Sequence, residues 1–146
     1  MPFVPPCQIH ASCVSVDGRG LVIVGPSGSG KSTLALQLMA LGAELVADDR
    51  CDLSSSIEGI YAARPSELPQ AIEARGLGLL CAKCIDRSRI VAVIDLGRTT
   101  ENRLPHLKNV EIDGHTLSLL HNSTQTDLAA ALFHFLKSGF HASMSE

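Results

Sequence analysis

The sequence carries one stretch whose residue types and spacing suit phosphate binding. Residues 25–32 read Gly-Pro-Ser-Gly-Ser-Gly-Lys-Ser, which fits the pattern GxxxxGK[ST]. Glycines let the backbone curl so that its N–H groups point inward at phosphate oxygens. In this pattern the lysine, Lys31, places an ammonium on the β- and γ-phosphates, and the hydroxyl of Ser32 binds the Mg²⁺ that bridges them. The stretch predicts a site for ATP and Mg²⁺ whose nucleotide ligands are Gly25, Pro26, Ser27, Gly28, Ser29, Gly30, Lys31, Ser32 and Thr33.

Two adjacent carboxylates, Asp48 and Asp49, follow a short apolar run at residues 45–47. One of them can hold Mg²⁺, directly or through water, while the other accepts the proton of an incoming hydroxyl. Two alternatives stay open at this point. The pair could merely begin the turn into Cys51, and Asp95, at the end of another apolar run, competes for the metal-side role.

These two groups need secondary-structure elements that bring them together. The apolar run at residues 20–24 predicts a buried strand that leads into the glycine loop. Leucines at helical spacing predict a helix from Lys31 to about Leu41, which Gly42 ends. The run 45–47 predicts the next strand, so the sheet is at least partly parallel. Ligands of open α/β sheets bind at the carboxyl ends of such strands, where both groups are expected.

The remaining chain predicts further strands and one more helix in a single domain of residues 1–146, with irregular ends at 1–8 and 140–146. Strands are expected at 9–16 and 90–96, and a hairpin at 110–120 turns at Asp113-Gly114. Residues 51–73 suit hairpins and surface loops, and an amphipathic helix is expected at 126–137, before Gly139.

Composition excludes several classes of protein. A net charge of −3 gives no basic surface for nucleic acid, and no apolar run approaches the roughly 18 residues of a membrane span. Five cysteines, an odd number, indicate reduced thiols and a cytoplasmic location. Cys81 and Cys84 form a CxxC, which could be half of a zinc site or a redox pair. Because a structural zinc site needs four ligands, incidental cysteines are favoured.

Four pieces of the sequence, in their order and spacing, resemble the kinase domain of the HPr kinase/phosphorylase family. They are His10-Ala11, the stretch 25–36 (GPSGSGKSTLAL), the stretch 45–49 (LVADD) and the stretch 73–78 (EARGLG). The resemblance covers most of the chain. It implies an α/β phosphate-loop fold of the phosphoenolpyruvate carboxykinase-like type, with a mixed sheet and flanking helices. It further implies an enzyme of the bacterial phosphotransferase system that transfers phosphate from ATP to a serine of the phosphocarrier protein HPr.

The resemblance also implies roles for single residues. Asp49 looks like the catalytic base, which takes the serine proton during phosphorylation and returns one when phosphoserine is cleaved. Asp48 would be the neighbour of this base that lies next to the metal, and Glu73 is similar to the family's second Mg²⁺ ligand. His10 matches an active-site histidine, although a lone histidine would otherwise be read as an ordinary surface residue. Arg75 and Arg103 could both stabilise phosphate charge, and the family's downstream catalytic arginine favours Arg103.

Several features separate this chain from the longer members of the family. Thr33 stands where many of them have a glutamate, and the family's separate N-terminal domain has no counterpart in residues 1–146. The segments after Gly78 also differ, which leaves phosphoserine cleavage, homo-oligomer formation and the docking of HPr open. Two alternative functions remain open: the chain could be a phosphate-loop kinase for a small molecule, or a nucleotide-binding regulator that does not hydrolyse or transfer phosphate.

Overall fold

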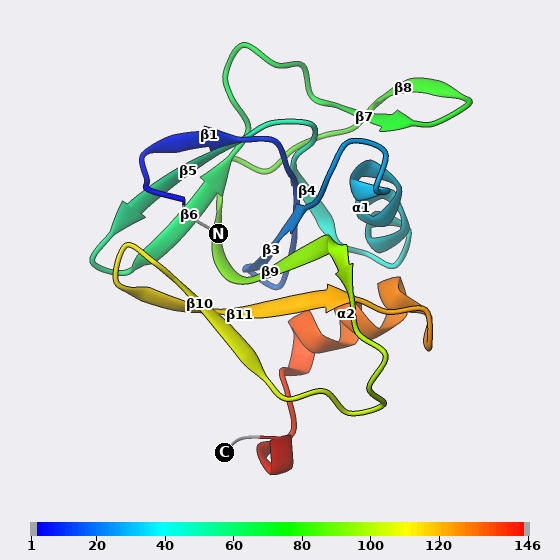
Figure 1. Ribbon diagram of the computed structural model, residues 1–146. Helices are drawn as coiled ribbons and strands as arrows, with labels where there is room; N and C mark the ends of the chain where they lie inside the picture. The colour runs from blue at the N-terminus through cyan, green and yellow to red at the C-terminus, as the bar shows by residue number, and fades with distance from the viewer. Residues whose placement is uncertain (1–2, 145–146) are drawn as a thin grey trace.

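A mixed β-sheet forms the centre of the protein, as a computed structural model of residues 3–144 shows (Figure 1). Nine strands make up this sheet: β1 (Cys7–Ile9), β2 (Ser12–Val16), β3 (Arg19–Val24), β4 (Glu44–Ala47), β5 (Cys51–Ser56), β6 (Gly59–Ala63), β9 (Ser88–Thr99), β10 (Lys108–Ile112) and β11 (His115–Asn122). A separate hairpin consists of β7 (Ala71–Ala74) and β8 (Gly78–Cys81). The helices are α1 (Lys31–Ala40) and α2 (Leu128–Ser138), followed by a short 3-10 helix, η1 (Ala142–Met144).

The long strand β9 organises the sheet. It runs parallel to β3 along one edge and parallel to β11 along the other, and it also pairs antiparallel with β6 near its start. Strands β3 and β4 are both antiparallel to β2, which lies between them, so β3 and β4 run in the same direction. The loops that follow β3 and β4 therefore leave the sheet at the same edge. The predicted α/β class with a partly parallel sheet is confirmed.

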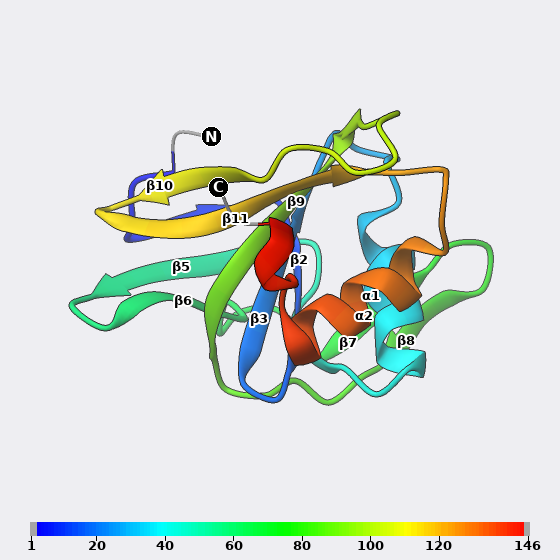
Figure 2. The ribbon, with the colours of Figure 1, turned by 90° about the horizontal axis from the view of Figure 1, so that it is seen from below.

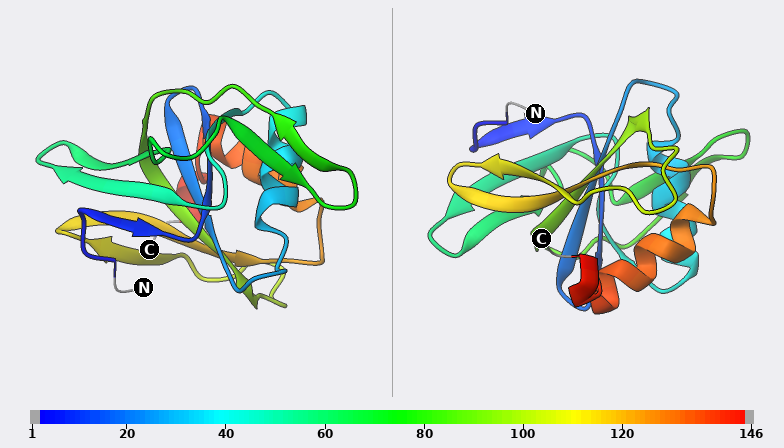
Figure 3. Two further views of the ribbon diagram at one scale, coloured as in Figure 1. Left: turned by 90° about the horizontal axis from the view of Figure 1, so that it is seen from above. Right: turned by 60° about the horizontal axis from the view of Figure 1, so that its bottom comes forward.

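Both helices pack on one face of the sheet, as the views in Figures 1 and 2 show. Alternate residues of β3 supply the two cores: Leu21 and Ile23 pack with the helices, while Val22 and Val24 face the opposite side. On that second side, strands β5, β6, β10 and β11 contribute to a second apolar cluster. Figure 3 shows the course of these strands from above and with the bottom of the molecule turned forward. Burial on both faces explains why β3 reads as a continuous apolar run.

Most predicted elements are present, with informative differences. The strand predicted at 9–16 is divided into β1 and β2, because the chain changes partner at His10 from β5 to β3 and β4. The hairpin of β7 and β8 continues past residue 73, and its turn contains Gly76 at φ 86°. Parts of the two ends expected to be irregular are ordered: Cys7 and Gln8 pair with β5, and η1 lies within the C-terminal stretch 140–146. Residues 1–2 and 145–146 lie outside the described part. Neither α1 nor α2 has the length and apolar character that crossing a bilayer requires.

Candidate active site

The glycine loop connects the end of β3 to the start of α1. Gly28 and Gly30 have φ values of 80° and 99°, in the left-handed region that favours glycine. Gly30 is the N-cap residue of α1, so no side chain caps this end, and the first turn contains no acidic residue. The first amides of a helix have no acceptor within the helix. They are available here to an anion, and the helix dipole favours one.

The loop is packed too closely for side chains at some positions. A Cβ on Gly25 would lie 2.6 Å from Oγ of Ser29, closer than such atoms approach in proteins. Oγ of Ser29 is buried and has no hydrogen-bond partner within residues 3–144. Gly25 must therefore remain a glycine for the loop to keep this curl.

The ammonium of Lys31 lies over the loop. Its Nζ donates hydrogen bonds to the carbonyl oxygen of Gly25 at 2.9 Å and to that of Pro26 at 3.3 Å. A lysine has three N–H donors, so the loop carbonyls occupy two of them and the third remains for a phosphate oxygen. The lysine is thereby held at the mouth of the loop.

Asp48 joins three elements at the carboxyl edge of the sheet. Its Oδ1 accepts hydrogen bonds from the hydroxyls of Ser32 and Ser12, both at 2.7 Å, and its Oδ2 accepts one from the backbone amide of Glu73 at 3.1 Å. The three donors thus engage both oxygens of the carboxylate. The arrangement fixes Asp48 relative to the first turn of α1 and leaves it little freedom to move.

Asp49 has a different environment from its neighbour. Its backbone is left-handed, at φ 70°, a conformation that costs an L-residue about 1 kcal/mol and that aspartate tolerates better than most. The amide of Ala11 donates to its carbonyl oxygen at 3.2 Å, which holds the strained residue in place. The side chain of Asp49 is exposed and lines the same cavity as the loop. Of the two carboxylates, only Asp49 is left open to an incoming group.

A cavity of about 700 Å³ contains most of the predicted site residues. Of the predicted nucleotide ligands, Pro26 and Ser29 do not line it. Pro26 contributes its carbonyl to Lys31, and Ser29 packs beneath the loop. The residues that do line it include His10, Asp48, Asp49, Glu73, Gly25, Ser27, Gly28, Gly30, Lys31, Ser32 and Thr33. The glycine loop, the acidic pair, His10 and Glu73, which come from separate parts of the sequence, thus line one cavity.

The two candidate arginines lie in different places. Arg75, in the turn of the β7–β8 hairpin, lines the loop cavity, and its guanidinium comes within 3.9 Å of where a Cβ on Gly28 would be. Arg103, which the resemblance favoured, lines another cavity between the 100–107 segment and α2. The structure does not bring Arg103 to the glycine loop, because the chain turns away after β9. Asp95 also does not line the loop cavity, and it accepts instead from the amide of Gly97.

Sequence reasoning missed two residues of this site. Ser12 is fully buried in β2 and hydrogen-bonds to Asp48, although 36 residues separate them. Leu79 of β8 lines the cavity, with 67% of its surface exposed. No local signal identifies Ser12, since it becomes a neighbour of Asp48 only when β2 pairs with β4. Arg75 and Leu79 depend on a hairpin that the sequence pattern did not predict.

The donors at this site fit Mg²⁺ bound beside a triphosphate. Ser32, Asp48 and Glu73 all offer oxygen ligands, and no cluster of three or more histidine, cysteine or acidic side chains arranged to hold a metal is present in residues 3–144. Mg²⁺ keeps several waters and is commonly held by one or two carboxylates together with phosphate oxygens. The protein thus supplies the small number of oxygen ligands that suits Mg²⁺ when a nucleotide completes the coordination.

Comparisons with known proteins agree with this geometry. The family model described as the HPr serine kinase C-terminal domain matches residues 2–120. HPr kinase/phosphorylase of Bordetella pertussis is 37% identical over 106 residues, which cover 67% of this chain and 34% of the relative. The relative from Aromatoleum aromaticum is 37% identical over 121 residues, covering 73% and 39%. The chain thus spans between a third and two fifths of the length of these relatives.

A solved structure shares the fold over almost the whole chain. The HPr(Ser) kinase/phosphatase from Coxiella burnetii superposes with a TM-score of 0.75 at 20% identity, covering 90% of this chain and 88% of that one. At this identity the likeness establishes the fold alone. Since the family model extends over most of the chain and includes the glycine loop and both aspartates, the chain belongs to the HPr serine kinase C-terminal domain family.

Proposed function

We propose that the chain is a serine kinase that transfers the γ-phosphoryl group of ATP to a serine of the phosphocarrier protein HPr. One observation carries the proposal: Asp48 is held by three hydrogen bonds, while the adjacent Asp49 is open to the cavity beside the glycine loop. Asp48 is therefore suited to a fixed position beside the metal, and Asp49 is suited to accept a proton from a substrate hydroxyl. The relatives named above support HPr as the substrate.

In this proposal each residue has a defined task. The loop amides and Lys31 bind the β- and γ-phosphates, and Arg75 stabilises charge on the transferred group. Asp49 accepts the proton of the serine hydroxyl as its oxygen attacks phosphorus in line with the leaving ADP. His10 lines the same cavity. Most of the acceleration comes from positioning and electrostatics.

Ser32 and Asp48 are the proposed direct ligands of Mg²⁺, and Glu73, whose backbone amide donates to Asp48, is a further proposed ligand. When bound, the ion neutralises charge on the phosphate oxygens. The 2.7 Å hydrogen bond between Ser32 and Asp48 keeps two oxygen donors on one side of the cavity.

The reverse direction follows from the same groups. A base that removes a serine proton can return one to that oxygen when phosphoserine is cleaved. The names of the relatives include phosphorylase or phosphatase. We propose that Asp49 serves both directions. In the reverse direction inorganic phosphate, bound where the β-phosphate of ATP lies, attacks the phosphorus of phosphoserine; the bond from phosphorus to the serine oxygen breaks, pyrophosphate leaves, and Asp49 returns the proton to the serine oxygen.

The test is incubation of the chain with γ-labelled ATP, Mg²⁺ and purified HPr, with the label followed on HPr. A serine-linked label on HPr that disappears in Asp49→Asn supports the proposal. An unlabelled HPr together with label on a metabolite pool indicates a small-molecule kinase. Tight ATP binding without ADP formation, equal in the parent and in Asp49→Asn, indicates a regulator without turnover.

A further inference from the structure

A second cavity of about 700 Å³ lies away from the glycine loop, and its lining is predominantly apolar. The 100–107 segment, β11, α2 and the chain after α2 enclose it. Six of its apolar side chains remain partly or largely exposed: Leu104, Leu107, Leu119, Leu120, Phe135 and Phe140. Apolar side chains gathered in an open hollow of this size are typical of a ligand site rather than of a core.

The apolar floor of this cavity has a defined shape. The rings of Phe135 and Phe140 pack against each other, with centroids 4.8 Å apart and planes inclined by 52°. Leu104, from the 100–107 segment, also lines the cavity, with 64% of its surface exposed. A hydrocarbon or aromatic body bound in the cavity would remove part of this apolar surface from water, which favours binding.

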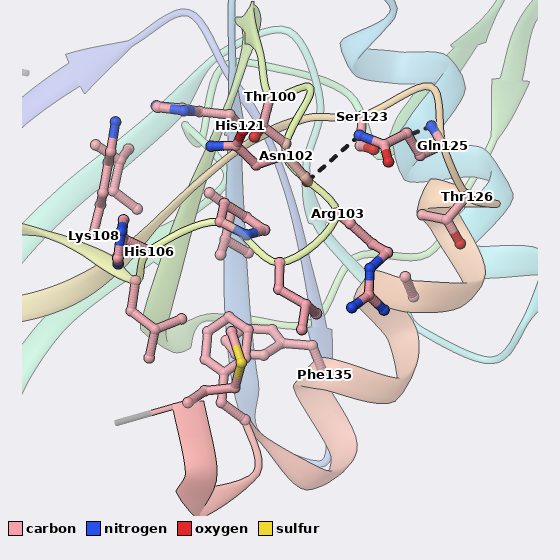
Figure 4. A pocket seen from close by; sticks show the side chains of 18 of the residues that line it. Thr100, Asn102, Arg103, His106, Lys108, His121, Ser123, Gln125, Thr126 and Phe135 are labelled. Atoms are coloured by element: carbon pink, nitrogen blue, oxygen red, sulfur yellow. Dashed lines mark hydrogen bonds between the residues drawn. The ribbon is translucent and has the colours of Figure 1, made fainter. Parts of the chain in front are cut away.

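The rim of the cavity is polar, and its two formally charged residues, Arg103 and Lys108, are both cationic. Arg103, His106, Lys108 and His121 line it. Figure 4 shows Lys108 and His106 next to each other on one side of the pocket and Arg103 on the other side, with Phe135 at its base. No aspartate or glutamate of residues 3–144 lines the cavity. Within residues 3–144 the one ion pair joins Arg98 to Asp95. Neither Arg103 nor Lys108 is therefore neutralised by a carboxylate of the described residues. Unpaired cations around an apolar hollow favour an anion that also has an apolar body.

We propose that this cavity binds an amphipathic anion, with its apolar body on Phe135 and Phe140 and a single carboxylate or phosphate head at the rim, where the cations Arg103 and Lys108 attract it from opposite sides. The nucleotide site has the opposite character, because its lining is half polar and includes three carboxylates, from Asp48, Asp49 and Glu73. The two cavities therefore suit different ligands, and the second one adds a site that phosphoryl transfer does not use.

Anilinonaphthalene sulfonate, whose aromatic body carries one anionic group, is a suitable probe for the intact chain. We expect saturable fluorescence enhancement that dodecanoate or dodecyl phosphate reverses and that dodecanol reverses at least about tenfold less effectively. The better competitor of the two anions identifies the head group. Displacement by dodecanol as effective as that by the anions would overturn the proposal, as would displacement by HPr with no effect of either anion.

Matched variants separate this site from general surface charge. The double variant Arg103→Gln/Lys108→Gln should weaken probe binding by about tenfold or more, because both charged contacts are lost. Lys83→Gln alters an exposed lysine that lines neither cavity, and it should bind the probe like the parent. Leu104→Glu puts a carboxylate at the mouth and should abolish binding without lowering the unfolding temperature. Equal weakening in Lys83→Gln and the double variant, or full binding in Leu104→Glu, contradicts the assignment.

Discussion

The hydroxyl of Ser32, in the first turn of α1, donates a 2.7 Å hydrogen bond to Oδ1 of Asp48, at the end of β4. This contact ties the phosphate loop to the acidic pair. Because Asp48 is fixed by Ser32, Ser12 and the amide of Glu73, the next residue is held in a left-handed turn at the edge of the cavity. The two aspartates are neighbours in sequence but have different surroundings, and we propose a separate task for each.

Asp49→Asn is expected to lower the rate of phosphoryl transfer by about 10²-fold or more, because it removes the proposed proton acceptor. Asparagine tolerates the left-handed backbone at least as well as aspartate does, so the unfolding temperature should not fall. Single-turnover kinetics together with ATP binding by calorimetry check both parts. A variant that transfers phosphate at the parent rate would show that Asp49 is not the base.

Ser12→Ala is expected to lower the free energy of unfolding by about 1 kcal/mol and to raise the Mg²⁺ concentration needed for half-maximal activity. It removes one of three donors that hold Asp48. Ser15→Ala is the matched control. Ser15 is also buried in β2, but its hydroxyl accepts from Ser88 instead. The control should lose similar stability with no change in Mg²⁺ dependence, and equal Mg²⁺ dependence in both variants would refute the role given to Ser12.

Arg75→Gln is expected to reduce phosphoryl transfer by about tenfold or more, and by a larger factor than Arg103→Gln does. The reason is position, since Arg75 lies over Gly28 and Arg103 lines the other cavity. Steady-state kinetics of both variants with saturating ATP make the comparison. A larger loss in Arg103→Gln would mean that the arginine suggested by the family resemblance acts at the site after all.

The cysteines should differ in their rates of alkylation. Burial raises the pKa of the Cys13 thiol well above its usual value, and burial also raises the pKa of Cys84. A raised pKa leaves less reactive thiolate at any pH below it, so both thiols should react slowly near neutral pH. Cys81 is exposed and should be modified first. Iodoacetamide labelling followed by peptide mass spectrometry gives the order, and early modification of Cys13 would contradict its burial.

The phosphate loop, α1, β4 and the aspartate pair could be predicted because their signals are local. A run of apolar residues, glycines at fixed positions and leucines at helical spacing occupy one continuous stretch, and the following strand ends at Asp48. The family resemblance added Glu73 and His10, and the structure places both in the loop cavity.

The remaining parts of the site depend on contacts between distant segments. Ser12 approaches Asp48 only because β2 is inserted between β3 and β4. Arg75 reaches the loop because β7 and β8 form a hairpin, whose short strands show no clear alternation of apolar and polar residues. Arg103 lines the other cavity, and nothing in the sequence indicates the direction in which the chain leaves β9.

A crystal structure of the chain with Mg²⁺ and a non-hydrolysable ATP analogue would show whether Asp49 faces the transferred phosphate. We expect the γ-phosphate at Nζ of Lys31, the ion between that phosphate and the oxygens of Ser32 and Asp48, and the carboxylate of Asp49 facing the γ-phosphorus from the open side. An analogue bound outside the glycine loop, or an Asp49 side chain turned away from the γ-phosphate, would contradict it.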